Sequence, residues 1–315
     1  IIFSHEDREF LTAKMHRFNL FKRLDSSVFA FGETIRRLKE RIEGYINLLD
    51  NSKNKDVKLD DSVGSLDSAL PTNINEMEDD FLENDEPALD YKYIIKVKHL
   101  KIKDYLTDLY YDKMVLDELY DEVKTVLHEK RDNKLAELKD IVKNKVLHTP
   151  YNAQNSKVLI FTAFADTANY LYDELAPYLT SLQITEKEKS NLLKKDIITA
   201  MISGTGKPRV SSGNIDKSFD SILSAFSPRS RIKKELPLTR QVDILIGTDC
   251  ISEGQNLQDC DCVINYDIQW NPVTLIQRFG RIDRIGSTNK DIKMINFFPD
   301  MALNEYLSLE KRVKS

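Results

Sequence analysis

Cysteine and histidine are scarce in this sequence, and their positions exclude two common kinds of site. The chain has 315 residues but only three cysteines, with no CxxC pair, and none of its five histidines lies past residue 148. Cys250, Cys260 and Cys262 lie in or beside apolar runs, where a free cysteine behaves as a small hydrophobic residue. We therefore expect no disulfide and no metal site, and a reduced, cytoplasmic protein.

Long apolar runs are also missing. No stretch has the length of apolar sequence that crosses a membrane, and the first residues, IIFSHEDREF, do not have the pattern of a signal peptide. We expect no membrane partner.

Negative charge is unevenly distributed. Residues 51–90 contain twelve acidic residues and three lysines, a net charge of −9, so the rest of the chain carries +4 of the total of −5. An acidic average therefore does not exclude nucleic acid as a partner, because phosphates are bound by local basic patches.

The first half of the chain has helical periodicity on both sides of this acidic stretch. Apolar residues recur at helical spacing within 8–49 and again from 101 to 145. Residues 51–90 contain two prolines and show no lasting period. We predict a helical segment at 1–50, an acidic linker or insertion at 51–90 and a helical hairpin at 91–148.

After Pro150, short apolar runs alternate with helical stretches. The runs lie at 157–162, 197–203, 242–248, 261–266 and 292–298. Strands that are apolar on both faces and are separated by helices indicate a parallel sheet covered on both sides. The sequence predicts an α/β fold at 149–299, a doubly wound parallel sheet, followed by a C-terminal helix at 300–315.

Asn271-Pro272 and Gly286 suit the two ends of a predicted helix over 272–285. In that helix Gln277, Arg281 and Arg284 would share one face, with Leu275, Ile276, Phe279 and Ile282 on the other. Arg278 would point sideways, and we predict a structural role for it beside an acidic neighbour. Periodicity alone favours a solvated basic face, because most basic amphipathic helices have no other role.

The run QRFGRIDRIG at 277–286 resembles motif VI of superfamily-2 helicases, especially SWI/SNF-type ATP-dependent translocases and their bacterial relatives. ILIGTDCISEGQNLQDCDCVINYDIQWNPVTLIQRFGRIDRIGS is similar to motifs V and VI in their usual order, and KVLIFTAFADT to motif IV. The resemblance covers 155–299. NLFKRLDSSVFAF is similar to the segment that precedes the second motor lobe in the bacterial proteins. The resemblance as a whole implies the RecA-like C-terminal lobe of a DNA translocase, with ATP and Mg²⁺ as cofactors.

The resemblance also implies roles for individual residues. Arg281 and Arg284 would be arginine fingers, since two guanidinium groups stabilise the charge that develops on a transferring phosphoryl group. The nucleotide contacts would come from Gln277, Gly254, Asn256 and Glu253, although many helicases have arginine where Glu253 stands. The nucleic-acid contacts would come from Thr162, Ser203, Gly204, Thr248, Asp249 and Trp270. The alternative is ordinary turns and caps after strands, with Trp270 as an anchor.

Two motifs that hold phosphates and magnesium are missing. GTGKP at 204–208 is no P-loop, because Met201 replaces its first glycine and Pro208 its final Ser or Thr. No DExD or DExH run is present either. We expect an N-terminal lobe of the same protein to complete the ATP site and to hold Mg²⁺. The chain alone should then hydrolyse no ATP.

Three functions remain open on the sequence. The leading hypothesis is the motor lobe of a translocase on double-stranded DNA, favoured by Gln277, the QWNP run and the missing histidine of the HRxGR pattern. The others are an RNA helicase lobe and a non-catalytic scaffold that binds a partner protein.

Overall fold

The computed structural model describes residues 5–53, 101–148, 150–182, 196–204, 206–232, 236–251, 254–268, 272–284 and 286–299. Almost all of the predicted acidic segment 51–90 and the whole predicted helix 300–315 lie outside these residues. Within them, no helix is both long enough and apolar enough to cross a membrane. The chain forms two compact units.

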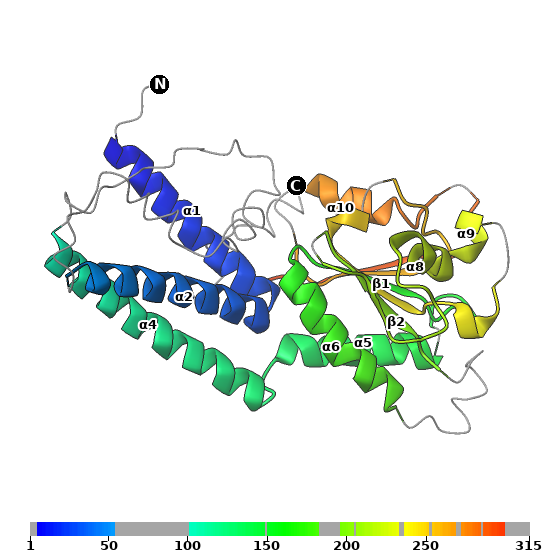
Figure 1. The fold of residues 1–315 in the computed structure, drawn as a ribbon. Coiled ribbons are helices and arrows are strands. Elements are labelled where there is room, and N and C mark those ends of the chain that lie inside the picture. The colour runs from blue at the N-terminus through cyan, green and yellow to red at the C-terminus, as the bar shows by residue number, and fades with distance from the viewer. Residues whose placement is uncertain are drawn as a thin grey trace. The chain divides into compact units, whose positions relative to one another are not determined.

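The described residues of unit 1 (1–20 and 31–130) are mostly helical. It contains most of α1 (His5–Ser26) and α2 (Val28–Lys53), and all of α4 (Ile102–His128). Helices α2 and α4 run side by side (Figure 1), and Ile46, Leu49, Leu106 and Leu109 form the core between them. The helices also approach closely at Gly32, where an added Cβ would lie 2.6 Å from a methyl group of Val123.

Unit 2 (residues 21–30 and 131–315) contains a six-stranded sheet of order β3-β2-β4-β1-β5-β6. Its strands are β1 (Val158–Phe161), β2 (Thr199–Ile202), β3 (Arg209–Val210), β4 (Ile244–Gly247), β5 (Cys262–Asn265) and β6 (Lys293–Asn296). All pairings are parallel except that of β3 with β2. The predicted fold class is confirmed.

Helices cover the sheet because its central strands are apolar on both faces. One face packs against α8 (Phe219–Phe226), with Leu159, Phe161, Ile222 and Phe226 in a shared core. Helix α6 (Ala165–Thr180) packs on β2 and β4, and α5 (Asn133–His148) contacts α6. The other elements of the unit are α9 (Pro228–Ile232), α10 (Pro272–Phe279), and the 3₁₀ turns η4 (Leu238–Arg240) and η5 (Asp249–Ile251).

The chain passes from unit 1 to unit 2 within α1 and returns within α2. Residues 21–30 thus belong to the α/β unit, where the ring of Phe29 stacks on that of Tyr170 with centroids 5.1 Å apart. The sequence grouped 91–148 as one hairpin, whereas α4 belongs to unit 1 and α5 to unit 2. Residues distant in sequence set this division, so helical periodicity does not reveal it.

Candidate functional site at the carboxyl edge of the sheet

Three of the predicted nucleic-acid residues directly follow the neighbouring strands β1, β4 and β2: Thr162, Thr248 and Ser203. The carboxyl ends of parallel strands lie at one edge of a sheet, which is where open α/β sheets bind ligands. The backbone N–H of Gly204 donates to the hydroxyl of Thr248 at 3.1 Å. The structure therefore brings Ser203, Gly204 and Thr248 together, with Gly204 exposed.

Thr162 requires a correction. The sequence predicts that its hydroxyl contacts a nucleic-acid phosphate, but the side chain is fully buried. The hydroxyl donates to Asp267 Oδ2 at 2.5 Å. A buried hydroxyl held by a carboxylate does not reach a phosphate in solvent, so Thr162 anchors the end of β1.

The predicted helix over 272–285 also requires a correction, because α10 ends at Phe279. After the bond from Gly280 N to Ile276 O, the next two bonds span three residues, from Arg281 N to Arg278 O and from Ile282 N to Phe279 O, and Asp283 N then donates to Phe279 O. Glycine lowers helix propensity, and the carbonyl of Arg281 accepts instead from Leu257 N at 3.0 Å. The shared helical face of Gln277, Arg281 and Arg284 therefore does not exist as predicted.

These three residues still lie on one short segment. Gln277 is exposed in the last turn of α10, and Arg281 and Arg284 follow in turns with partly exposed side chains. Arg284 Nε donates to the carbonyl of Gly280 at 3.1 Å. The apolar side differs from prediction as well: Leu275 and Ile282 are buried, but Ile276 is 70% exposed.

Arg278 has the structural role that the sequence predicted. Its side chain is fully buried, and its Nε pairs with Asp249 Oδ1 at 3.0 Å. Its Nη1 donates to Asn265 Oδ1 at 3.0 Å, and its guanidinium lies 4.9 Å from the centre of the Phe161 ring. The carboxylate of Asp249, predicted to be near nucleic acid, is thus engaged by this arginine.

The turn after η5 contains two of the predicted nucleotide contacts. Gly254 is exposed and has φ +69°, a backbone conformation that residues other than glycine rarely adopt. The side-chain Oδ1 of Asn256 is buried and accepts no hydrogen bond from the described residues. Glu253 and Trp270 lie outside the described residues, so their predicted roles stay predictions.

Asp267, which follows β5, is a site residue that the sequence did not predict. Its side chain is 3% exposed, and Oδ1 accepts from Ala163 N at 2.7 Å. Its Oδ2 accepts from Ser26 Oγ at 2.6 Å as well as from Thr162. The position directly after a buried strand was a usable signal for Asp267. No sequence signal identified Ser26, which is 241 positions away.

Charged groups from α1 and α5 surround this network. Arg23 pairs with Asp166 and lies over the Phe164 ring, and Lys134 Nζ donates to the carbonyl of Ser26 at 3.1 Å. Burial raises the pKa of the Asp25 carboxyl to about 6, although Lys134 opposes this shift. Burial also lowers the pKa of Lys134.

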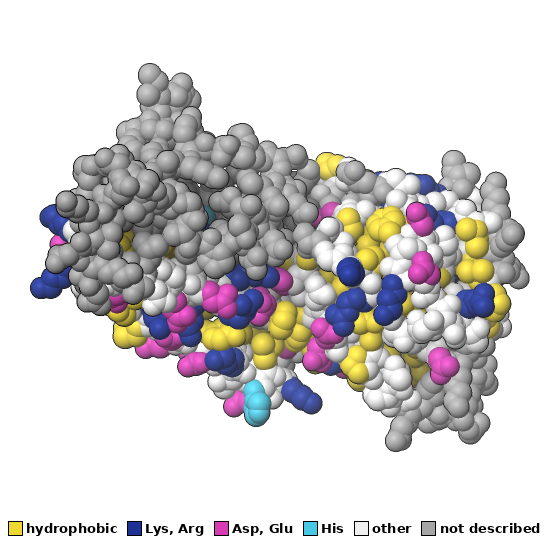
Figure 2. Space-filling view, in the orientation of Figure 1, with side chains coloured by type: hydrophobic (Ala, Val, Ile, Leu, Met, Phe, Trp, Pro, Cys, Tyr) yellow, Lys and Arg dark blue, Asp and Glu magenta, His cyan; other side chains and the backbone are white. Residues whose placement is uncertain are grey.

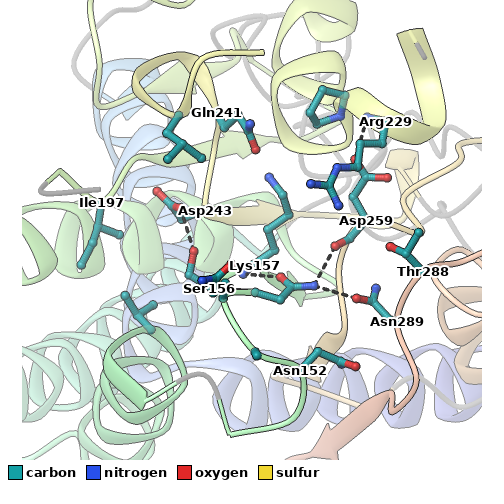
Figure 3. Close-up of a pocket in the computed structure, with 16 residues that line it drawn as sticks. Asn152, Ser156, Lys157, Ile197, Arg229, Gln241, Asp243, Asp259, Thr288 and Asn289 are labelled. Carbon is teal, nitrogen blue, oxygen red and sulfur yellow. Dashed lines mark hydrogen bonds between the residues drawn. The ribbon is translucent and has the colours of Figure 1, made fainter. Parts of the chain in front are cut away.

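A cavity of about 310 Å³ lies at the opposite edge of the sheet (Figure 3). It is lined by residues that precede the strands, including Lys157, Ile197, Asp243 and Asp259. The carboxylate of Asp243 accepts from Ser156 Oγ and Ile198 N, and that of Asp259 from two N–H groups of α9. These acids stabilise the fold, so we do not place the function in this cavity despite its size.

Comparisons with known proteins agree with a helicase fold. Residues 213–286 match the helicase conserved C-terminal domain. The uncharacterized ATP-dependent helicase YqhH of Bacillus subtilis is 40% identical over 67 residues, 21% of this chain and 12% of YqhH. The probable ATP-dependent RNA helicase MJ0669 of Methanocaldococcus jannaschii is 40% identical over 70 residues, 22% of this chain and 19% of that protein.

Among solved structures, the C-terminal part of the Fun30 ATPase domain is 18% identical. It matches with a TM-score of 0.38 over 75% of this chain and 63% of that one. The matches to the two curated relatives span less than a fifth of either protein. Residues 213–286 of this chain are therefore similar to the helicase conserved C-terminal domain.

Proposed function

We propose that unit 2 is the second motor lobe of an ATP-dependent translocase on double-stranded DNA, of the SWI/SNF type. In this proposal it supplies arginine fingers and backbone contacts, and an N-terminal lobe of the same protein supplies the P-loop and the DExx residues. The chain as given contains neither motif.

One observation carries the proposal: the segment after β4 and the segment after α10 are bonded together at the carboxyl edge. The ion pair between Arg278 and Asp249 joins them at one point, and the bond from Leu257 N to Arg281 O joins them at another. The residues that resemble motifs V and VI therefore form one connected surface. A helicase needs this arrangement to connect its nucleic-acid contacts to its ATP site.

The residues present suit one wall of an ATP site. The buried Asn256 Oδ1 is an acceptor that a ribose hydroxyl would satisfy. Gly254 leaves space beside it, because a Cβ there would meet no atom within 4 Å. Gln277 and Glu253 complete the proposed nucleotide contacts. The fit extends to one wall only, since no group of acidic residues in the described chain could hold Mg²⁺.

When bound, ATP supplies the phosphoryl group whose transfer to water drives the motor. Arg281 and Arg284 stabilise the negative charge that develops during this transfer, and arginine suits the task because it stays charged and offers several donors in a planar fork. The buried Arg278 fixes the start of the turn that carries them.

Nucleic acid binds at the same edge in this proposal. The exposed Gly204 contacts the phosphate backbone, the buried Ser203 and Thr248 hold its loop at the strand ends, and Trp270 transmits the contact to the ATP site. Such contacts carry no sequence information, so the affinity is modest and depends on salt.

A second candidate is an RNA helicase lobe, because MJ0669 is named an RNA helicase. The QWNP run and glutamine at position 277 favour DNA. A scaffold without nucleotide chemistry is the third.

The test is ATP hydrolysis by the protein that carries both lobes. We expect double-stranded DNA to stimulate hydrolysis and single-stranded RNA of equal length to have little effect. Stimulation by RNA alone would favour the second candidate, and no hydrolysis under either condition would favour the scaffold. Residues 1–315 alone should hydrolyse no ATP.

A further inference from the structure

Asp267 connects three parts of unit 2 that are distant in sequence. Its carboxylate accepts from Ser26 Oγ at 2.6 Å, from Thr162 Oγ1 at 2.5 Å and from Ala163 N at 2.7 Å. Hydrogen bonds to a charged acceptor are among the strongest in proteins, and these lie in a buried site. The end of β1 and the end of α1 are thereby held on one side chain.

The backbone of Asp267 faces the proposed motor site. Its carbonyl oxygen accepts from Arg278 Nη1 at 3.4 Å, and the same guanidinium pairs with Asp249 and bonds Asn265. Arg278 N–H and C=O belong to the turn that leads to Arg281, since Arg281 N donates to Arg278 O at 3.2 Å. A shift of Asp267 would therefore move the turn that carries Arg281 and Arg284, the proposed arginine fingers.

Ser26 is the last residue of α1, directly before the break between α1 and α2. Its neighbour Ser27 is equally buried but is bonded differently. Both hydroxyls bond Thr167 Oγ1, Ser26 at 2.7 Å and Ser27 at 2.9 Å, but Ser27 Oγ also accepts from Ala30 N at 3.0 Å, at the start of α2. Of these two serines, the structure bonds Ser26 alone to Asp267.

We propose that Ser26 and Asp267 are positioning residues for the motor: the junction between α1 and α2 holds Asp267, and Asp267 holds the arginine segment in its active arrangement. This inference rests on the proposed function, and neither residue touches nucleotide in it. Ser26 lies in the part of α1 that belongs to unit 2, close to the point where the chain passes between the units.

The physical reason is geometric. Without the Ser26 hydroxyl, the Asp267 carboxylate keeps its bonds from Thr162 and Ala163 but loses the bond that joins it to the end of α1. The carboxylate can then shift toward the space that the hydroxyl leaves. Charge stabilisation depends steeply on position, and a displacement of about 1 Å can cost about 100-fold in rate. The side-chain bonds of Ser26 go to Thr162, Thr167 and Asp267 and not to the proposed ribose contacts, so its loss should lower kcat and leave KM for ATP unchanged.

The experiment compares Ser26→Ala with Ser27→Ala in the protein that carries both lobes. Each change removes one buried hydroxyl, so the losses of stability should be similar. DNA-stimulated ATP hydrolysis is measured well below the unfolding temperature of both variants. We expect kcat of Ser26→Ala to fall about tenfold at unchanged KM, and kcat of Ser27→Ala to stay within twofold of the unsubstituted protein.

A second measurement uses residues 1–315 and does not depend on activity. Trp270 is the only tryptophan of the sequence and stands three positions after Asp267. Its emission spectrum should shift in Ser26→Ala and stay unchanged in Ser27→Ala, which supports the positioning role.

Equal kcat values in both variants, or equal falls in both, would overturn this inference alone, because the unsubstituted protein would still be an active translocase. No hydrolysis by the unsubstituted protein with DNA would overturn the proposed function and this inference together. A fall in kcat accompanied by a matching rise in KM would also contradict a positioning role.

Discussion

The two edges of the sheet use polar residues for different purposes. At the amino edge, Lys145 pairs with Asp261 at 2.9 Å, both fully buried, and Asn152 and Asn155 tie neighbouring loops together. At the carboxyl edge, Gly204, Gln277 and Gly254 are exposed beside a buried network around Asp267 and Arg278. A cavity of about 310 Å³ lies at the amino edge, whereas the residues that resemble helicase motifs V and VI lie at the carboxyl edge.

Since we propose the function at the carboxyl edge, the cavity at the amino edge does not mark the proposed site. Unit 2 also displays both cationic and acidic side chains on its visible surface (Figure 2), so a charge pattern alone does not locate it either. The two edges differ in what their polar groups do. At the amino edge they stabilise the fold, and at the carboxyl edge we propose that they contact ligands.

The largest effect is expected from Lys145→Ala, which tests the structural role of the amino edge. The change leaves the Asp261 carboxylate buried without its cation, which typically costs about 3–5 kcal/mol. Denaturant unfolding of residues 1–315, followed by Trp270 fluorescence, should show this loss. Lys143→Ala, on an exposed position of the same helix, should change stability little. A loss below about 1 kcal/mol would contradict a structural role for this edge.

A smaller effect is expected from Asp25→Asn, near the carboxyl edge. The folded pKa of about 6 lies above the ordinary value of 3.8, so the stabilising effect of protonation is complete below pH 3.8 and is lost as pH rises through 6. Asn resembles the protonated form. The variant should therefore be more stable than the unsubstituted protein at pH 8, by at most about 3 kcal/mol.

This advantage should shrink as pH falls from 7 to 4, because the carboxyl of the unsubstituted protein then becomes protonated in the folded state. Burial, Lys134 and Asp267 together set the shift. Asp220→Asn, with an 84% exposed side chain, is the control and should show little pH-dependent difference. A constant difference for Asp25→Asn between pH 8 and pH 5 would show that the pKa of Asp25 is not raised.

The smallest effect is expected from Thr248→Ala. The change removes the hydroxyl that accepts from Gly204 N, a contribution of about 1 kcal/mol, and should weaken duplex DNA binding about fivefold. The salt dependence of binding should not change, because a neutral hydroxyl releases no counterion. Fluorescence anisotropy over a salt series measures both. Thr180→Ala, at the end of α6, should leave affinity unchanged; an equal loss there would remove Thr248 from the interface.

Much of the sheet could be predicted from sequence. The apolar runs at 157–162, 197–203 and 242–248 contain β1, β2 and β4, because strands covered on both faces are continuously apolar. The antiparallel strand β3 was missed, since two residues are too short to produce a pattern.

The site could be predicted only in part. The local sequence pattern placed Ser203 and Thr248 correctly at the ends of strands. The arrangement of the other site residues depends on hydrogen bonds between segments that are distant in sequence. Leu257 N donates to the carbonyl of Arg281, which therefore does not continue the helix. The Thr162 hydroxyl donates to Asp267, and this bond lies in the interior. Neither partner is close in sequence, so neither outcome follows from periodicity.

The most direct test of the account is kcat for DNA-stimulated ATP hydrolysis by the two-lobed protein carrying Arg281→Ala and Arg284→Ala. Arg240→Ala, an exposed arginine just before β4 at the amino edge, is the matched control. The account predicts a fall of about 10³-fold or more for the pair, the range known for arginine fingers, and an unchanged rate for the control. An unchanged rate for the pair would contradict the assignment of the motor site to the carboxyl edge.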